Sequence, residues 1–373
     1  MNIMATWLLR LDAPGDGPRL AVKDCIDMAG LPTTVGCPVL AERARPAAAD
    51  APVVATARQA GARIVGKANL TELCWSADGI NGWSGTPRNP LDPLRMPGGS
   101  SSGSAVAVAA GEADVGYGTD TGGSVRVPAA CCGIVGLKTT WSRIPLDGVY
   151  PLAPSLDTVG PLGRDVAAVE LGMRLLEPGF TAPAYAGPMT AGRLRTSVDV
   201  LPEIDAAVDA ALATAGLASE DVPGVDFATP LRAADVLIDR EGFLANEHLL
   251  PDVRRLGRRI QRNMAEGAEY GPADLARARE QQQAIRDLLT AALRRFPVLA
   301  LPTLPVFPPL LETRGTWLTT LTAPVNVTGL PALALPLTVK ESLPASLQLV
   351  GPPGGEEILI GIARIVEAAV SAG

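Results

Sequence analysis

The stretch Gly98-Gly99-Ser100-Ser101-Ser102-Gly103-Ser104 is followed, after one short strand, by Gly118-Thr119-Asp120-Thr121-Gly122-Gly123-Ser124. A serine hydroxyl is a weak nucleophile until a base takes its proton, and glycines let backbone N–H groups gather where an oxyanion would form. Upstream, Ala21-Val22-Lys23-Asp24 places a lysine after an apolar strand, whereas the single histidine, His248, lies far from both turns. These residues favour a serine–serine–lysine arrangement over a serine–histidine–aspartate one.

The composition excludes several classes of protein. The chain has 373 residues, of which 47% are hydrophobic and 19% charged, and its formal net charge is −7. An acidic chain lacks the excess of lysine and arginine that is typical of nucleic-acid-binding proteins. Its apolar stretches fall well short of the roughly 18 residues that a membrane span needs, and the first nine residues lack the features of a signal peptide. We therefore expect no nucleic acid and no membrane as partners, and we predict a cytoplasmic protein.

Cysteine and histidine usage argues against bound metals and disulfides. The five cysteines include no C-x-x-C pair, and the adjacent Cys131 and Cys132 are poorly placed to bridge each other. Reduced thiols are the preferred interpretation. The glycine–serine loop lacks the Gly-Lys-Ser/Thr ending of a nucleotide-binding P-loop. We therefore expect no metal ion and no other cofactor. The five arginines between 254 and 262 are interpreted as a solvated helix face.

Strand and helix patterns alternate along the chain. We expect strands at 19–24, 62–66, 114–118, 194–200, 298–301, 332–337 and 346–350. Helices are expected at 51–61, 104–110, 125–132, 204–215, 273–295 and 358–370. Because no long linker interrupts this alternation, we predict a single α/β domain over residues 1–373. It would contain a large mixed, mostly parallel β-sheet covered by helices on both faces.

Further motifs follow in order: Gly66-Lys67-Ala68-Asn69, Gly133-Ile134-Val135-Gly136-Leu137-Lys138, Ser155-Leu156-Asp157-Thr158-Val159-Gly160-Pro161 and Asn326-Val327-Thr328-Gly329-Leu330-Pro331. With the two serine turns, they closely resemble the amidase signature family, which includes malonamidase, fatty acid amide hydrolase and the glutaminase subunit of tRNA amidotransferase. The match runs from Lys23 almost to the C-terminus, with the signature core at about 62–165. The resemblance implies the α/β fold above and hydrolysis of a carboxamide C–N bond.

The resemblance also assigns roles to residues. It makes Ser124 the nucleophile that carries an acyl group, Ser100 the bridging serine, entered through a cis peptide, and Lys23 the base. The backbone amides of Thr121, Gly122, Gly123 and Ser124 would form the oxyanion hole. Physically, Ser100 can relay the Ser124 proton to Lys23 if that amine is neutral, which burial favours. Ser101, Ser102 and Ser104 compete for the bridging role, and the choice of Ser100 follows from the resemblance alone.

Other residues are expected to support the turns or to line the pocket. Asp120 and Arg126 are interpreted as a structural ion pair, and Ser101 as a supporting turn residue. Cys74 lacks a histidine partner, so it is expected to line the acyl pocket rather than to act as a nucleophile. Arg314 is the single basic residue in the expected pocket stretches, which favours a neutral or modestly polar acyl group. The full set expected in the pocket is Cys74, Trp75, Ser76, Tyr150 and Trp317.

One departure from the family leaves the biological setting open. Only 22 residues precede Lys23, whereas relatives usually carry a longer N-terminal segment. We therefore expect the lid over the site, and the interface of a homodimer, to differ from those of relatives with a longer N-terminus. We favour a free-standing amidase acting on a small-molecule amide. The alternatives are a glutamine-hydrolysing subunit of an amidotransferase complex and an inactive binding protein on the same scaffold. Ammonia release by the purified protein would separate the three.

Overall fold

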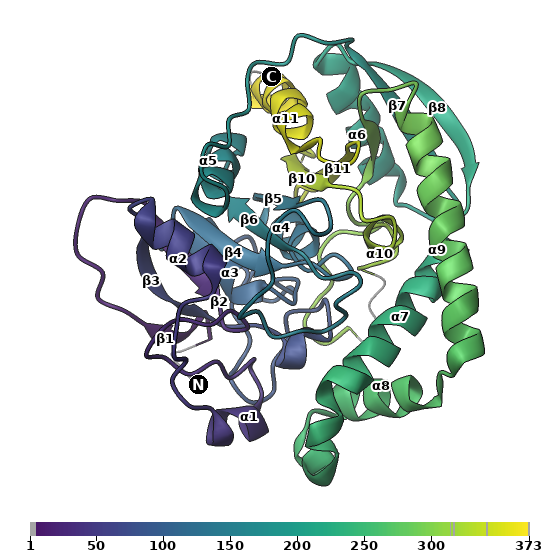
Figure 1. The fold of residues 1–373 in the computed structure, drawn as a ribbon. Coiled ribbons are helices and arrows are strands. Elements are labelled where there is room, and N and C mark those ends of the chain that lie inside the picture. Colours follow the sequence, from purple (N-terminus) through teal and green to yellow (C-terminus); the bar gives the residue numbers. More distant parts are fainter. Residues whose placement is uncertain (1–4, 314, 316–317, 341, 372–373) are drawn as a thin grey trace.

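One large β-sheet runs through the molecule (Figure 1). The computed structural model describes residues 5–313, 315, 318–340 and 342–371. Arg314 and Trp317, which were considered for the pocket, lie outside the described residues. The sheet has 11 strands in the order β1-β3-β2-β4-β6-β5-β10-β11-β9-β7-β8. The strands are β1 (Trp7–Arg10), β2 (Arg19–Lys23), β3 (Arg63–Ala68), β4 (Val115–Thr119), β5 (Val135–Lys138), β6 (Val159–Gly163), β7 (Thr190–Thr196), β8 (Ala218–Val225), β9 (Leu299–Pro302), β10 (Ala332–Leu337) and β11 (Ala345–Val350).

The predicted mixed sheet is confirmed, but its strand pairs are not mostly parallel. Of the ten pairings among the described residues, six are antiparallel and four parallel. The parallel pairs lie toward the two ends of the sheet, where crossover helices connect the strands. In the middle, β5 and β6 run antiparallel to each other and to their outer neighbours. The sequence analysis did not recognise either of these strands, so the sheet was expected to be more parallel than it is.

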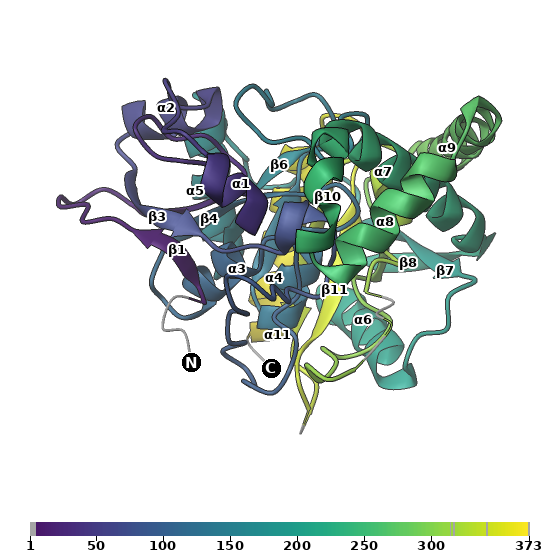
Figure 2. The same cartoon turned by 90° about the horizontal axis from the view of Figure 1, so that it is seen from below.

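Helices cover both faces of the sheet (Figures 1 and 2). On β4, Val115 contacts α5 on one face, whereas a Cβ on the next residue, Gly116, would meet Ser104 of α3 on the other. Successive residues of a strand point to opposite faces, so α3 and α5 lie on opposite sides. The helices are α1 (Pro38–Arg43), α2 (Pro52–Gln59), η1 (Glu72–Cys74), α3 (Ser102–Ala109), α4 (Arg126–Cys132), α5 (Val166–Leu176), α6 (Pro202–Thr214), α7 (Ala228–Asn246), η2 (Glu247–Arg255), α8 (Arg258–Glu269), α9 (Pro272–Leu293), α10 (Ala323–Asn326) and α11 (Glu356–Ser371).

Small residues bring α3 close to the sheet and thereby position the first serine turn. A Cβ on Gly116 would lie 3.0 Å from the Ser104 carbonyl oxygen, and a Cβ on Gly118 would lie 2.6 Å from Ser101 Oγ. The two strand glycines therefore permit a close approach that any larger residue would block. This approach holds the turn against the ends of β2 and β4.

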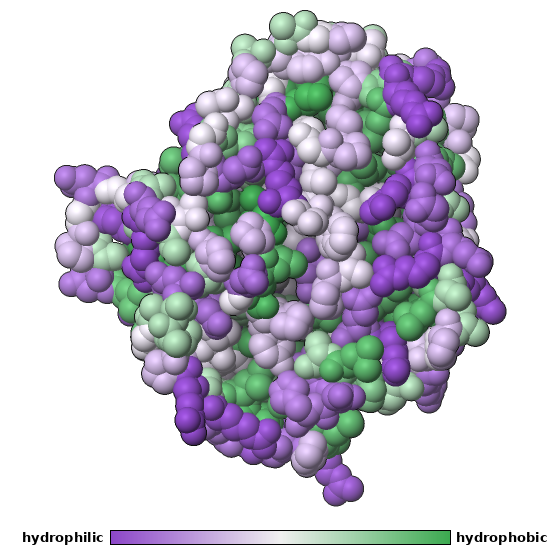
Figure 3. Space-filling model, in the orientation of Figure 1, coloured by the Kyte–Doolittle hydropathy of each residue, from purple (hydrophilic) through white to green (hydrophobic). Residues whose placement is uncertain are grey.

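The helices α7, α8 and α9 pack together beside the sheet and form the outer part of the molecule (green, Figure 1). Hydrophilic side chains gather over this side in Figure 3. The five arginines between 254 and 262 do not share one helix, because η2 ends at Arg255 and α8 begins at Arg258. Among the described residues, every helix is too short or too polar to span a membrane.

Candidate active site

Lys23 and Ser100 meet in the interior of the protein. Lys23, the last residue of β2, donates hydrogen bonds from Nζ to Ser100 Oγ and to Thr119 Oγ1, both at 2.7 Å. Lys23 and Ser100 have no exposed surface, and Thr119 is 5% exposed. Thr119, which the sequence analysis did not consider as a partner of the lysine, ends β4. Because β2 and β4 are parallel neighbours, their carboxyl ends bring these two side chains together.

The peptide bond between Gly99 and Ser100 is cis, as the family resemblance implied. A Cβ on Gly99 would lie 2.6 Å from Thr71 Oγ1 and 2.7 Å from the Gly79 nitrogen, so glycine is required for this packing. The Ser100 carbonyl oxygen accepts a hydrogen bond from the Thr71 N–H at 3.1 Å. These contacts fix the turn from which the Ser100 hydroxyl reaches Lys23.

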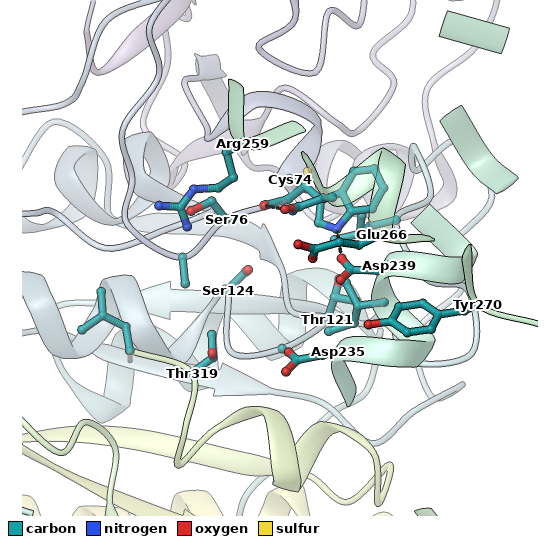
Figure 4. A pocket seen from close by; sticks show the side chains of 17 residues that line it. Cys74, Ser76, Thr121, Ser124, Asp235, Asp239, Arg259, Glu266, Tyr270 and Thr319 are labelled. Carbon is teal, nitrogen blue, oxygen red and sulfur yellow. Dashed lines mark hydrogen bonds between the residues drawn. The ribbon is translucent and has the colours of Figure 1, made fainter. Parts of the chain in front are cut away.

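Ser124 lies in the second turn and points into a cavity (Figure 4). The residue is 7% exposed, and its carbonyl oxygen accepts the Ser101 N–H at 3.3 Å, which ties the two serine turns together. In the part of the chain that the structure describes, the Ser124 hydroxyl makes no hydrogen bond, including none to Ser100. Catalytic hydrogen bonds often form only when substrate is bound. The hydroxyl is thus available to a molecule that enters the cavity.

A buried ion pair holds the Ser124 turn from behind. Asp120 and Arg126 are both 0% exposed and lie 2.9 Å apart. Asp120 also accepts the backbone N–H groups of Gly123 at 2.8 Å and Val125 at 3.1 Å. Burial alone would raise the pKa of Asp120, but the Arg126 guanidinium holds it well below the usual range. The arginine in turn donates to Asn326 Oδ1 at 2.5 Å and to Gln348. The structure thus places Asp120 and Arg126 beneath the turn rather than in the cavity.

The expected oxyanion hole needs one correction. The Gly123 N–H is directed at the Asp120 carboxylate, as described above, and is therefore not free to bind an oxyanion. Thr121, Gly122 and Ser124 line the cavity, and their N–H groups have no hydrogen-bond partner among the described residues. Gly123 serves the turn by its conformation instead. Its φ of 133° is rare for other residues, and a Cβ there would lie 2.2 Å from Thr322 Oγ1.

Asp157 fixes the side chain of Thr121. The Thr121 hydroxyl donates to Asp157 Oδ1 at 2.5 Å, and the N–H groups of Leu152 and Ala153 donate to Oδ2 at 3.0 and 3.1 Å. Burial raises the pKa of Asp157, although these three donors oppose the rise. The motif containing Asp157 was part of the resemblance, but its contact with Thr121 was not predicted.

The cavity in front of Ser124 has a volume of about 330 Å³. All three residues of the predicted loop segment, Cys74 to Ser76, line it. Leu73 and Cys74 have φ values of 52° and 58°, and this left-handed turn presents the segment to the cavity. Tyr150 is not among the lining residues; its hydroxyl donates instead to Asn246 Oδ1 at 2.9 Å. The described residues that line the cavity are Cys74, Trp75, Ser76, Ala77, Thr121, Gly122, Ser124, Leu152, Asp235, Ile238, Asp239, Arg259, Asn263, Glu266, Tyr270, Leu318 and Thr319.

The sequence analysis missed the side of the cavity that α7 and α8 supply. Arg259 is not simply part of a solvated helix face, because it lines the cavity and lies 2.9 Å from Asp78. The carboxylates of Asp235, Asp239 and Glu266 line the same side. No motif marks this segment. The one local signal was the four-residue spacing of Asp235 and Asp239, which places both on the same face of a helix.

Comparison with known proteins agrees with this geometry. The model of the Amidase family matches residues 16–181 and 196–360. The chain belongs to the amidase family. It is 35% identical to a glutamyl-tRNA(Gln) amidotransferase subunit of Halobacterium salinarum, over 95% of this chain and 96% of that protein. It is also 35% identical to the 2-amino-5-chloromuconic acid deaminase of Comamonas testosteroni, over 96% of this chain and 82% of that protein. A crystal structure of an amidase matches with a TM-score of 0.81 and 29% identity, over 95% of this chain and 84% of that one.

Family membership makes the protein an amide-hydrolysing enzyme with the α/β fold of the amidases. The relatives include both amidases and amidotransferase subunits, so family membership alone does not identify the substrate. That question has to be addressed from the residues that line the cavity. Within the described residues, no group of three or more histidine, cysteine, aspartate or glutamate side chains is arranged to hold a metal ion. The Ser124 turn offers a hydroxyl and unpartnered backbone amides to the cavity, and the Ser101 N–H ties it to the turn in which Ser100 meets the Lys23 amine. Hydroxyls, a base and backbone amides are the parts that acyl transfer to a serine requires.

Proposed function

We propose that this amidase cleaves a small-molecule amide through an acyl-enzyme on Ser124, with Ser100 relaying protons to Lys23. One observation carries the proposal. The Lys23 amine and the Ser100 hydroxyl lie 2.7 Å apart beneath a cavity in which the Ser124 hydroxyl is unpartnered among the described residues. A serine becomes a useful nucleophile when a base is within reach of its proton, directly or through a relay.

Two buried lysines, Lys23 and Lys67, have different surroundings, and the difference indicates which of them can act as a base. Lys67, on β3 beside Lys23, lies 2.7 Å from the Asp24 carboxylate, so an anion stabilises its charged form. Lys23 forms no ion pair among the described residues and contacts two hydroxyl groups instead. Burying a charge without a counter-ion is costly. We therefore assign the proton-accepting role to Lys23 and a structural role to Lys67.

The proposed reaction conserves atoms and charge at each step. Ser124 Oγ attacks the amide carbonyl carbon, while its proton passes to Ser100 and the Ser100 proton passes to Lys23. The relay then returns a proton to the amide nitrogen, the C–N bond breaks and the amine leaves. Water attacks the resulting ester while its proton enters the same relay. The relay then returns that proton to Ser124 Oγ as the ester C–O bond breaks, and the acid is released. The free N–H groups of Thr121, Gly122 and Ser124 would stabilise the oxyanion in both halves.

Hydrolysis of glutamine is the second candidate function, because a relative of 35% identity is an amidotransferase subunit. Such a role would require a partner that receives ammonia. We favour independent action on a small-molecule amide, in a monomer or a homodimer and without nucleic acid. We also propose a cytoplasmic setting, because all five cysteines, including the adjacent Cys131 and Cys132, are free thiols.

Ammonia release by the purified protein alone tests the proposal. The panel contains aliphatic amides, aryl amides, ureas and glutamine, and the variant Ser124→Ala is compared with Ser102→Ala. Ser102 is a matched control, because its buried hydroxyl also lacks a partner in the described residues but lies outside the cavity. Loss of turnover in Ser124→Ala but not in Ser102→Ala supports the assignment. Glutamine as the sole substrate favours the amidotransferase role, and full activity of Ser124→Ala would overturn the mechanism.

A further inference from the structure

One wall of the Ser124 cavity is lined by acidic side chains. Asp235 and Asp239 lie one turn apart on α7, and Glu266 lies on α8, which packs against α7. All three line the cavity, with the Tyr270 hydroxyl beside them. In Figure 4, Glu266, Asp239 and Tyr270 lie to one side of Ser124 and Arg259 lies to the other. We call Asp235, Asp239 and Glu266 the acidic wall.

The positive charges near the acidic wall do not neutralise it. Arg259 lies 2.9 Å from Asp78 and is thereby committed to another carboxylate. Arg262 approaches Glu266 only to 3.9 Å, and both side chains are at least half exposed. Asp239 accepts a hydrogen bond from the neutral Trp75 indole N–H at 2.9 Å. Asp235 has no ion pair or hydrogen bond among the described residues. Within that part of the chain, the two α7 carboxylates are therefore left without a counter-ion.

A second observation shows that this cavity is built to receive a molecule. The Ser124 side chain is nine-tenths buried, has no hydrogen-bond partner among the described residues and is aimed into the same space as the acidic wall. A volume of about 330 Å³ is at the lower end of the range of small-molecule sites. A ligand whose carbonyl carbon reaches Ser124 can therefore bring its remaining atoms to the acidic wall, which lines the same cavity.

We propose that the acidic wall binds a cationic group, such as a primary ammonium or a guanidinium, carried by the amide substrate. This inference rests on the function proposed above and specifies its substrate class. The three carboxylates are not grouped as ligands of a metal ion, so an organic cation fits the wall better. The wall would repel a second carboxylate. The proposal replaces the neutral or modestly polar acyl group that was expected from the sequence by a cationic one.

Amides that differ only in terminal charge test the inference. The probes are ω-amino, ω-hydroxy and ω-carboxy amides of straight chains from four to seven carbons, and kcat/KM is measured for each. We expect the best amino amide to exceed the hydroxy amide of equal length by at least about tenfold, and the carboxy amide to be the poorest substrate. Equal kcat/KM values for the amino, hydroxy and carboxy amides of one chain length, or a preference for the carboxy amide, would overturn the inference.

A double variant with a matched control locates the preference. In Asp235→Asn/Asp239→Asn, the ratio of amino to hydroxy amide kcat/KM should fall by about tenfold or more. The asparagine at 239 can still accept the Trp75 N–H, so packing is preserved. The control is Glu269→Gln, which removes an exposed charge from α8 outside the cavity and should leave the ratio unchanged. A ratio that stays unchanged in the double variant would contradict the inference.

Binding to Ser124→Ala separates this inference from the proposed mechanism. Calorimetric titration of that variant with the amino and hydroxy amides reports recognition without turnover. Tighter binding of the amino amide, lost when the two aspartates are also replaced, supports the acidic wall even if Ser124 is not the nucleophile. Equal binding of the two probes overturns the inference, whether or not the wild-type protein hydrolyses them.

Discussion

The floor of the cavity and its acidic wall differ in how tightly the rest of the protein holds them. We use the word floor for four residues that lie beneath the cavity without lining it, namely Lys23, Ser100, Asp120 and Arg126. They have no exposed surface, and each is hydrogen-bonded to another segment. In the wall, Asp235 and Glu266 are exposed to the cavity and belong to helices outside the sheet. A change in the floor therefore disturbs folding and chemistry together, whereas a change in the wall can alter the choice of substrate alone.

The largest expected effect is on the base in the floor. Lys23→Met should lower amide kcat/KM by about 10³-fold, because the relay loses its proton acceptor. Hydrolysis of a matched ester should fall less, since an alkoxide needs a proton on leaving less than an amide nitrogen does. The measurement is the ratio of amide to ester rates. The control, Lys67→Met, removes a buried lysine that is paired with Asp24. It should reduce stability and leave that ratio unchanged, and an unchanged ratio in Lys23→Met would place the base elsewhere.

The next effect is on the ion pair beneath the nucleophile turn. Asp120→Ala leaves the Arg126 charge buried without its counter-ion, which should lower the free energy of unfolding by about 3–5 kcal/mol. Denaturant unfolding measures this loss. The surface pair of Arg295 and Glu220 is the control, because both side chains are about 60% exposed. Glu220→Ala should cost less than about 1 kcal/mol. Similar losses in the two variants would show that the floor is not held more tightly than the surface.

The smallest effect concerns the wall and depends on pH. Burial raises the pKa of Asp239 to about 7, the charges of Asp235 and Glu266 add to the rise, and the Trp75 N–H and the Arg262 charge oppose it. The folded protein then holds a proton that the unfolded chain has released between about pH 4 and 7, so this group's contribution to stability falls as pH rises through that window. Asp239→Asn removes the ionisation. Its melting temperature should exceed that of the wild type by on the order of 2 °C above pH 7 and by less near pH 4.

Thermal melts from pH 4 to 8 check this expectation, with Glu269→Gln as the control. A difference in melting temperature between Asp239→Asn and the wild type that does not change with pH would show that the wall does not raise the pKa of the Asp239 carboxyl. A functional site whose removal stabilises the protein is common, because binding residues are selected for their ligand rather than for folding.

The floor was largely predictable from sequence because its motifs combine residue types that few other structures require. The contact between Lys23 and Ser100 and the pairing of Asp120 with Arg126 were both foreseen. The Gly123 N–H was assigned wrongly, because a motif does not show which way an amide points. The wall was not foreseen, because an acidic pair on a helix also fits an ordinary solvated face. Only the packing of α7 against α8 shows that this face meets Ser124.

The strands β5, β6 and β8 were not predicted, for similar physical reasons. β8 is an edge strand whose residues are mostly exposed and include Pro223 and Gly224, so it carries little apolar pattern. β5 and β6 are short and rich in glycine, and their strand character depends on partners far away in the sequence. Most of the apolar strands and the helices α2, α3, α4, α6, α9 and α11 were foreseen, because burial imposes a periodic pattern on them, whereas α1, α5, α7 and α10 were not predicted.

Covalent labelling tests the central claim most directly. The protein is treated with a fluorophosphonate or a sulfonyl fluoride, its remaining activity is followed, and the modified peptide is mapped by mass spectrometry. The account predicts one label per chain, located on Ser124, with loss of activity in proportion to labelling and no label at this position in Ser124→Ala. A label confined to another serine as activity is lost, or hydrolysis that continues after Ser124 is fully modified, would contradict it.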